Sequence, residues 1–359
     1  MGHIVVIGVG AIGSFLLRHL ARSRRVSRLT IVDRDRYDAT NIAGQDIEAR
    51  HVGEPKAVAQ ARRVRHAVPH LQVTALVAAV EDVPLGALQG SLIAACLDSR
   101  AARMTVNQAA WRLGVPWVDA GIDAGGLLAR VRVYVPAPAA ACLECGWDRR
   151  DYDALEQTYP CAAGATAAPT AAPSALGALA AAIQAIECDK LLAGDMSGAL
   201  VGREVLLDAR FNTLLVTAYP RNPACRMPDH DGWRISPLGA RHTDTTVGDA
   251  LAVGGALRGA AGGLSFGIAG QRFVTTLRCR ACGVVRPCFK LDRRVRSSPP
   301  RCRSCGQPVQ PTGMDVDDML PADDVPSDVR DRPLAALGVR ARDVVTLRTP
   351  ELDAHFLVD

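Results

Sequence analysis

Three glycines near the start of the chain have the spacing of a phosphate-binding turn. Gly8, Gly10 and Gly13 follow an apolar run, and a second apolar run ends at Asp33. In such a turn the first glycine permits the tight bend, the second lets a phosphate approach the backbone, and the third lets the next helix pack against the strand. Asp33 would accept hydrogen bonds from ribose hydroxyls. The pattern indicates a nucleotide without saying which one.

Polar side chains also follow later apolar runs. Lys56 stands on the first turn of a helical segment, and Asp98 and Arg103 follow the run that ends at Cys96. Because open α/β sheets bind ligands at the carboxyl ends of their strands, these side chains should meet in one crevice. A lysine facing phosphates and a carboxylate able to hold magnesium suit a nucleoside triphosphate better than nicotinamide. Arg103 could equally be a solvated helix residue.

Cysteines form the next group with clear chemistry. The chain holds eleven cysteines and begins without an export signal, which favours metal binding over disulfides. Two C-x-x-C pairs, Cys279/Cys282 and Cys302/Cys305, are separated by nineteen residues, and each pair is followed by glycine. This spacing predicts a zinc ribbon whose metal site is closed and structural.

The elements that must position these residues follow from an alternation of short apolar runs and helical stretches. Strands are expected at 4–8, 29–33, 73–77, 92–96 and 117–121, and helices at 12–23, 55–67, 100–113 and 176–193. Such alternation predicts an α/β fold, with a Rossmann-like and mostly parallel sheet covered on both faces. Residues 126–137 should begin an antiparallel extension, and residues 203–218 read as a strand pair around Asn212.

Composition excludes several classes of protein. The net charge is +5, and the basic residues, almost all arginine, are spread along the chain without interleaved aromatic residues. We therefore expect no nucleic-acid partner. No stretch has the length and apolar character of a membrane span, and the chain opens on a strand rather than on a signal peptide. We expect a cytoplasmic protein with no membrane role.

Four motifs in order resemble the ThiF/MoeB/HesA superfamily, which includes the ubiquitin-activating enzymes. They are GxGxxG, then D-x-D-x(5)-N-[LI], then G-x-x-K, then D-[NS]-x(3)-R-x(3)-N, and the resemblance covers about residues 3–230. It implies an enzyme that uses ATP and magnesium to adenylate the C-terminal glycine carboxylate of a ubiquitin-like or sulfur-carrier β-grasp protein. It also implies a homodimer, and a conjugating enzyme or sulfurtransferase as a further partner.

The resemblance assigns roles to individual residues. Asp33 would bind the ribose, Asn41 and Lys56 the phosphates, and Asp98 the magnesium ion, although Asn41 could instead be a turn former. Arg103 and Asn107 would shape the site. The residues expected around the nucleotide are Gly8, Gly10, Gly13, Asp33, Asp35, Asn41, Gln45, Lys56, Asp98 and Arg103.

One position departs from the family pattern. The family reads N-L-x-R-Q, with an arginine that reaches the triphosphate, whereas this chain has Gly44 between Ala43 and Gln45. An arginine beside developing phosphate charge can contribute roughly a thousandfold in rate. Arg34 or Arg36 could substitute for it, a partner could supply it, or adenylation could be weak.

Two further cysteine positions follow from the same resemblance. Cys161 matches the family position C-x-x-x-G-[VA] in a loop that crosses the nucleotide site, where some members form a thioester or acyl persulfide; a thiolate suits this chemistry. Alternatively, Cys161 is a small buried residue. The resemblance also implies a second zinc site, for which Cys142, Cys145, Cys225 and His230 are the expected ligands; Asp229 in place of His230, or no metal, are the alternatives.

These observations define an expected organisation and four functional hypotheses. The expected parts are an adenylation domain at 1–235 with a crossover loop near 150–175, a linker at 236–268, a zinc ribbon at 269–310 and a tail at 311–359. The leading hypothesis is activation of a carrier protein, with Lys56, Asp98 and Cys161 in catalytic roles. The others are a peptide-tailoring adenylating enzyme, a non-catalytic carrier or leader-peptide binding module, and an NAD-dependent oxidoreductase.

Overall fold

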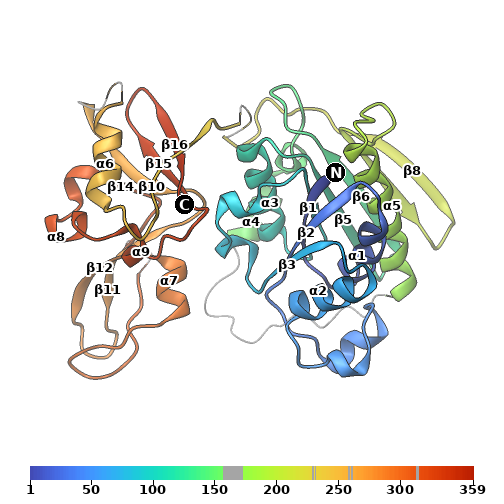
Figure 1. The fold of residues 1–359 in the computed structure, drawn as a ribbon, viewed down its shortest axis with the longest axis horizontal. Helices are drawn as coiled ribbons and strands as arrows, with labels where there is room; N and C mark the ends of the chain where they lie inside the picture. The colour runs from blue at the N-terminus through green and yellow to red at the C-terminus, as the bar shows by residue number, and fades with distance from the viewer. Residues whose placement is uncertain (157–172, 229, 231, 258, 260–261, 313–314) are drawn as a thin grey trace. The chain divides into compact units, whose positions relative to one another are not determined.

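The computed structural model describes residues 1–156, 173–228, 230, 232–257, 259, 262–312 and 315–359 (Figure 1). The chain divides into two compact units. Unit 1 contains residues 1–80 and 88–233, and unit 2 contains residues 81–87 and 234–359. Each unit has its own sheet and its own hydrophobic core.

Unit 1 is built on an eight-stranded sheet in the order β3-β2-β1-β4-β5-β6-β7-β8. Five strands run parallel, as expected, and three extend the sheet in antiparallel fashion. The parallel strands are β1 (Gly2–Ile7), β2 (Val26–Val32), β3 (Gln72–Leu76), β4 (Leu92–Ala95) and β5 (Trp117–Asp123). The antiparallel strands are β6 (Leu128–Tyr134), β7 (Arg203–Asp208) and β8 (Thr213–Ala218).

Helices cover both faces of this sheet. Ile4 and Val6 of β1 belong to a core cluster with residues of α1, α2 and α5, whereas Val5 points to the opposite face because side chains alternate along a strand. Helix α3 contacts β4 and β5. The helices of unit 1 are α1 (Gly13–Arg22), α2 (Lys56–Ala67), α3 (Arg100–Leu113), α4 (Arg149–Glu156) and α5 (Ser174–Leu192), with short 3-10 turns η1 (Ala39–Ala43), η2 (Ala49–His51) and η5 (Leu143–Gly146).

Unit 2 contains a five-stranded sheet and a separate three-stranded sheet. The larger sheet has the order β14-β10-β15-β16-β9, formed by β9 (Ile235–Pro237), β10 (Ser265–Ile268), β14 (Met319–Pro321), β15 (Val344–Arg348) and β16 (Asp353–Leu357). The smaller sheet has the order β12-β11-β13, formed by β11 (Phe273–Arg278), β12 (Val285–Leu291) and β13 (Val316–Asp317). Its helices are α6 (Val247–Gly255), α7 (Asp292–Ser297), α8 (Ser327–Arg330) and α9 (Leu334–Leu337), with the 3-10 turn η8 (Ala322–Asp324).

The second half of the chain differs from the expected linker and tail. Residues 236–268 include α6 and β10, which place Val247 and Phe266 in the core of unit 2. Residues 311–359 supply four strands to the two sheets of the same unit. The glycine-rich and acidic composition of these stretches hides their buried apolar positions, because each strand is only two to five residues long.

The helices of the chain bear on whether it could span a membrane. Within the described ranges, none combines the length and the apolar character that crossing a bilayer requires.

Candidate functional site

The three glycines of the turn after β1 are required for different reasons. Gly8 has φ +85°, and a Cβ on Gly13 would stand 2.0 Å from the carbonyl oxygen of Gly8, so neither position accommodates a side chain. At Gly10 an added Cβ would meet only the Gln45 amide nitrogen, at 3.9 Å. Among the described residues, no atom therefore requires glycine at position 10, and the space above it can be taken by a ligand.

Asp33 anchors this turn to the end of β2. Its carboxylate is buried, and its two oxygens accept hydrogen bonds from the backbone N–H groups of Val9 at 2.7 Å and Asp35 at 2.8 Å. Burial raises the pKa of Asp33, and the two backbone hydrogen bonds act in the opposite direction. Each carboxylate oxygen retains a second lone pair, so the group can hold the turn and still accept a hydrogen bond from a ligand hydroxyl.

Lys56 begins α2 with its ammonium group near the end of β2. Only 8% of the residue is exposed, and Nζ lies 3.6 Å from Asp35 Oδ2 and 5.7 Å from the centre of the Tyr37 ring. Its backbone N–H donates to the carbonyl of Asp35 at 2.8 Å. The Asp35 carboxylate is more than half exposed, so the lysine is paired loosely enough to face an anionic ligand.

Asn41 and Gln45 lie in the segment that follows β2. Asn41 belongs to η1, where its side-chain oxygen accepts from the backbone N–H of Asp38 at 3.2 Å, as a turn-forming residue does. Gln45 differs, because its side-chain Oε1 is buried and has no hydrogen-bond partner among the described residues. A buried amide oxygen without a partner is costly, which is typical of a group that a ligand completes.

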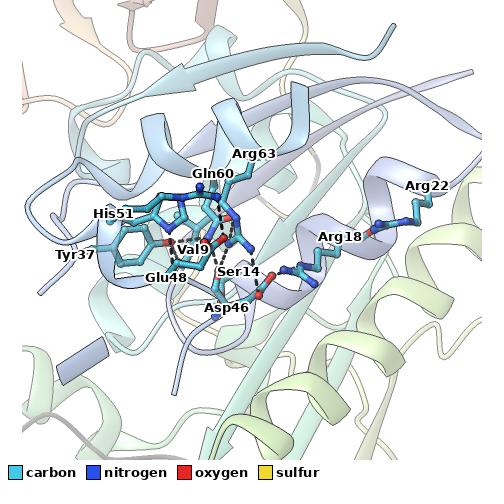
Figure 2. Close-up of polar contacts among 11 residues, drawn as sticks. Val9, Ser14, Arg18, Arg22, Tyr37, Asp46, Glu48, His51, Gln60 and Arg63 are labelled. Atoms are coloured by element: carbon cyan, nitrogen blue, oxygen red, sulfur yellow. Dashed lines mark hydrogen bonds and ion pairs between the residues drawn. The ribbon is translucent and has the colours of Figure 1, made fainter. Parts of the chain in front are cut away.

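A polar network missed by sequence reasoning fixes the segment around Gly44 (Figure 2). The Asp46 carboxylate pairs with the guanidinium groups of Arg18 from α1 and Arg63 from α2, and its backbone N–H donates to Ser14 Oγ at 3.0 Å. The Arg63 guanidinium also donates to the Asp46 carbonyl, as does Gln60 Nε2 at 3.2 Å. The only sequence signal is that Gln60 and Arg63 lie four and seven residues after Lys56, on one face of a helix.

This network continues to the glycine turn. Gln60 Nε2 donates to the Tyr37 hydroxyl at 2.8 Å, and that hydroxyl donates to the Val9 carbonyl at 3.1 Å (Figure 2). Burial raises the pKa of Tyr37, so the phenol keeps its proton and remains a donor. The turn, the segment after β2 and α2 are thus linked by side chains from four separate stretches of sequence.

Arg34 and Arg36, the two arginines that could substitute for the family arginine missing at Gly44, are both on the surface. Arg34 Nε lies 3.6 Å from Asp35 Oδ1, with 69% of its side chain exposed, and Arg36 donates to the Gly53 carbonyl at 2.8 Å. Arg63 is more enclosed, with 16% of its side chain exposed, and it contacts the residue two positions after Gly44. Arg63 is therefore the more enclosed of the two guanidinium groups, Arg18 and Arg63, that the fold holds beside this segment.

Asp98 and Arg103, which follow β4, lie in different environments. Asp98 is exposed and forms no ion pair or hydrogen bond within the described part of the chain, whereas the next residue, Ser99, caps α3. Arg103 is not a solvated helix residue: Nε lies 3.0 Å from the fully buried carboxylate of Asp119, and the guanidinium also donates to the Leu97 carbonyl. The loop is held by Arg103, and the carboxylate left available for a cation is that of Asp98.

Asn107 contacts the turn that contains Cys142 and Cys145. It is completely buried, accepts from the Leu143 backbone N–H at 3.1 Å, and donates to Glu144 Oε1 at 3.1 Å. Asn107 therefore stabilises the C-x-x-C turn of η5, and these hydrogen bonds do not connect it to the glycine turn. Cys161, the expected nucleophile, and Asp229, the alternative metal ligand, lie outside the described residues.

The first expected metal site is assembled from two distant segments of unit 1. The ligand atoms of Cys142, Cys145, Cys225 and His230 all lie within 4.8 Å of one another. Cys142 Sγ and Cys225 Sγ are 3.7 Å apart, and Cys145 Sγ is 3.9 Å from His230 Nε2. In a tetrahedral zinc site with Zn–S bonds of about 2.3 Å, two sulfurs stand about 3.8 Å apart. The donor set and its spacing fit zinc.

The second expected metal site lies wholly in unit 2. Cys279, Cys282, Cys302 and Cys305 place their sulfurs within 4.8 Å of one another, with 3.5 Å between Cys279 and Cys305 and 3.6 Å between Cys282 and Cys302. Both C-x-x-C turns end in a glycine with positive φ, Gly283 at +72° and Gly306 at +73°. Four cysteine sulfurs at these distances also fit a closed structural zinc site.

Comparisons with known proteins address the first unit. A model of the ThiF family matches residues 1–227. The molybdopterin-synthase adenylyltransferase of Escherichia coli is 28% identical over 228 residues, which is 62% of this chain and 86% of that protein. The adenylyltransferase and sulfurtransferase UBA4 of Yarrowia lipolytica is 30% identical over 156 residues, which is 40% of this chain and 39% of that protein.

Solved structures support the fold of the same unit. The crystal structure of E. coli MccB with ATP superposes with a TM-score of 0.52 at 18% identity, and covers 63% of this chain and 66% of that one. The family match ends at residue 227, before the zinc ribbon and most of unit 2.

Proposed function

The chain belongs to the ThiF family, and from this premise we propose that it is an adenylyltransferase acting on the C-terminal glycine carboxylate of a ubiquitin-like or sulfur-carrier protein. The observation that carries the proposal is the space above Gly10, which the described residues leave open; it is bordered by the side-chain amide of Gln45, whose buried oxygen has no hydrogen-bond partner among those residues. Lys56 and Asp98 supply the cation and the carboxylate that a triphosphate with magnesium needs.

In the proposed reaction a carboxylate oxygen of the carrier attacks the α-phosphorus of ATP. The bond between the α-phosphorus and the bridging oxygen breaks, and pyrophosphate leaves with the electron pair, so the products are an acyl adenylate and pyrophosphate. Lys56 would neutralise phosphate charge, Asp33 would accept from the ribose, and Asp98 would hold magnesium. The magnesium ion, when bound, would offset the negative charge of the leaving group.

Gly44 makes the source of an arginine the main mechanistic question. We propose that Arg63 serves in place of the family arginine, because the Asp46 network holds its guanidinium beside residues 44–46. Arg34 and Arg36 are more exposed and are paired with Asp35 and Gly53. An arginine held by two hydrogen-bonding groups loses less entropy when it meets phosphate than a mobile surface arginine does.

Further partners belong to the same proposal. Both cysteine-rich clusters would bind structural zinc, and a homodimer is expected.

Cys161 would receive the carrier from the adenylate: its thiolate attacks the acyl carbon, AMP leaves, and a thioester remains. If so, incubation with ATP and carrier yields an adduct that dithiothreitol releases and that Cys161→Ala does not form; the same adduct in the variant would show that Cys161 is not the acceptor.

A second candidate function is adenylation of a peptide rather than of a globular carrier. The observation that favours it is unit 2, which lies almost wholly beyond the family match and is folded around its own core. A peptide without a globular surface needs such an additional binding unit. Exchange with a peptide carboxylate, and none with β-grasp carriers, would select this function.

Pyrophosphate exchange tests the proposal directly. Radiolabelled pyrophosphate should enter ATP only when a suitable carrier is present, and Asp98→Asn should slow this exchange about a hundredfold or more. Asp324→Asn, another exposed aspartate, is the matched control and should leave the rate unchanged. ATP binding without exchange for any tested carrier would favour the binding module, and reduction of NAD by a substrate would contradict adenylation.

A further inference from the structure

One segment of the chain has a large excess of basic over acidic residues, although basic residues occur along the whole sequence. Residues 272–310, which we call the basic ribbon, contain ten arginine or lysine residues and a single acidic residue, Asp292. This segment therefore carries a formal charge of +9, whereas the whole chain carries +5. The rest of the chain is thus formally −4.

A zinc centre would account for only a small part of this charge. Four thiolates around one Zn²⁺ carry a net charge of −2, which would still leave the ribbon at about +7. Within the ribbon, Arg293 is buried against Asp343, and Arg296 and Arg272 face Asp292. The ribbon cations that form no ion pair with any carboxylate of the described residues are Arg278, Arg280, Arg286, Lys290, Arg294, Arg301 and Arg303.

Among the described residues, no aspartate of unit 2 forms an ion pair with these seven cations, although Asp315 interacts electrostatically with Arg278. Seven aspartates lie between residues 315 and 331, close by in sequence. Asp315 instead accepts from Thr276 and Thr312, and Asp328 pairs with Arg332. Exposed cationic groups repel one another where they lie close together, and an anionic partner would relieve that repulsion.

The two metal-binding turns present equivalent arginines. Each reads Cys-Arg-x-Cys-Gly, and in each the glycine N–H donates to the carbonyl of the first cysteine at 2.9 Å. Arg280 and Arg303 therefore occupy the same position in two matching turns, and both are exposed. The turns are joined through their sulfurs, so the two guanidinium groups are carried on one rigid base.

Apolar side chains next to these cations favour a polypeptide over a nucleic acid. Val284 and Val285, directly after the first turn, are 41% and 47% exposed. The ribbon has no exposed aromatic residue on which a base could stack, since Phe273 is fully buried and Phe289 is half-buried. Exposed aliphatic groups match the side chains of a protein partner and not a sugar–phosphate backbone.

We propose that the basic ribbon is a docking surface for an acidic, partly apolar segment of a partner polypeptide. The carboxylates of that segment pair with the unneutralised guanidinium groups around Arg280 and Arg303, and its apolar side chains cover Val284 and Val285. Charge complementarity of this kind sets the encounter rate and the choice of partner. The docking requires neither ATP nor the glycine turn, so it can be measured apart from adenylation.

Fluorescence anisotropy with the full-length protein tests this surface. The probe is a labelled 20-residue peptide of alternating glutamate and leucine; a peptide of equal length with glutamine for glutamate and a labelled 20-base-pair DNA duplex are compared with it. The acidic peptide should bind at least tenfold more tightly than the glutamine peptide and than the duplex, and raising the salt from 50 to 200 mM should weaken it. Equal affinity for the two peptides, or tighter binding of DNA, would overturn the proposal.

Variants locate the surface. Arg280→Glu with Arg303→Glu should weaken binding of the acidic peptide about tenfold or more, whereas Arg24→Glu with Arg25→Glu, on the surface of unit 1, makes the same charge change and should leave it intact. Metal content measured alongside shows whether the ribbon is still folded. Should the first variant lose metal, Arg286→Glu with Lys290→Glu, on β12 and away from the cysteine turns, should give the same loss. An equal loss in the unit 1 control would refute a local surface.

Discussion

Some polar residues near the glycine turn already have partners within the protein, whereas others are left for a ligand. Arg103 is held by Asp119, and Asn41 closes a short turn. By contrast, Asp98 is exposed without a partner in the described chain, and the Gln45 amide oxygen is buried without one. The Asp98 carboxylate and the Gln45 amide oxygen are therefore the two acceptors that a ligand could complete.

Two glycines of the same turn should respond differently to alanine. Gly10→Ala adds a methyl group to open space and should change the free energy of unfolding by less than about 1 kcal/mol, yet it should weaken ATP binding about tenfold or more. Gly13→Ala brings a Cβ against the Gly8 carbonyl and should destabilise unit 1 by about 3 kcal/mol.

Urea unfolding and calorimetric ATP titration separate the two effects. All four tryptophans, Trp111, Trp117, Trp147 and Trp233, lie in unit 1, so their fluorescence follows the unfolding of that unit. Unchanged ATP affinity in Gly10→Ala would mean that no ligand approaches the backbone at this position.

Among the elements, the local sequence pattern predicted the strands and turns that depend on neighbouring residues. All five parallel strands overlap the apolar runs at which strands were expected, and both cysteine sets follow from spacing and family resemblance. The sheet of unit 2 was missed because strands such as β9 and β14 are three residues long and draw their stability from distant partners. The Asp46 network was also missed, since it joins residues 14, 18, 46 and 63, and no sequence period links those positions.

The two arginines that clasp Asp46 should differ in what they contribute. Arg63 is mostly enclosed and bonds to both the carboxylate and the carbonyl of Asp46, so Arg63→Ala should cost about 2 kcal/mol of unit 1 stability. Arg18 is more than half exposed, and Arg18→Ala should cost less than about 1 kcal/mol. Tryptophan fluorescence in urea measures both, and equal costs would mean that the enclosed contact is not the stronger one.

At the scale of the whole molecule, each unit carries its own cysteine-rich cluster. One joins η5 to the end of unit 1, and the other joins the two turns of the ribbon. Because each zinc would bind a set of ligands confined to one unit, loss of one metal should leave the other unit folded.

Metal analysis of the purified protein should accordingly give two zinc ions per chain. His230→Ala and Cys302→Ser should each reduce this to one, and only His230→Ala should lower the urea midpoint seen by tryptophan fluorescence. A content of one zinc in the parent protein would mean that one of the two clusters does not hold this metal.

The division of the chain into units also has a consequence for biosynthesis. Residues 81–87 belong to unit 2, with Val83 and Leu85 buried, although they are flanked on both sides by strands of unit 1. A ribosome therefore releases this segment long before β10 or β15 exists. Unit 2 cannot complete its core until Val345, Leu347 and Val358 emerge, and a chain stopped at residue 233 would contain residues 81–87 without the rest of the unit to which they belong. Truncation after unit 1 therefore cannot remove the second unit completely, because residues 81–87 of that unit are encoded within the sequence of the first.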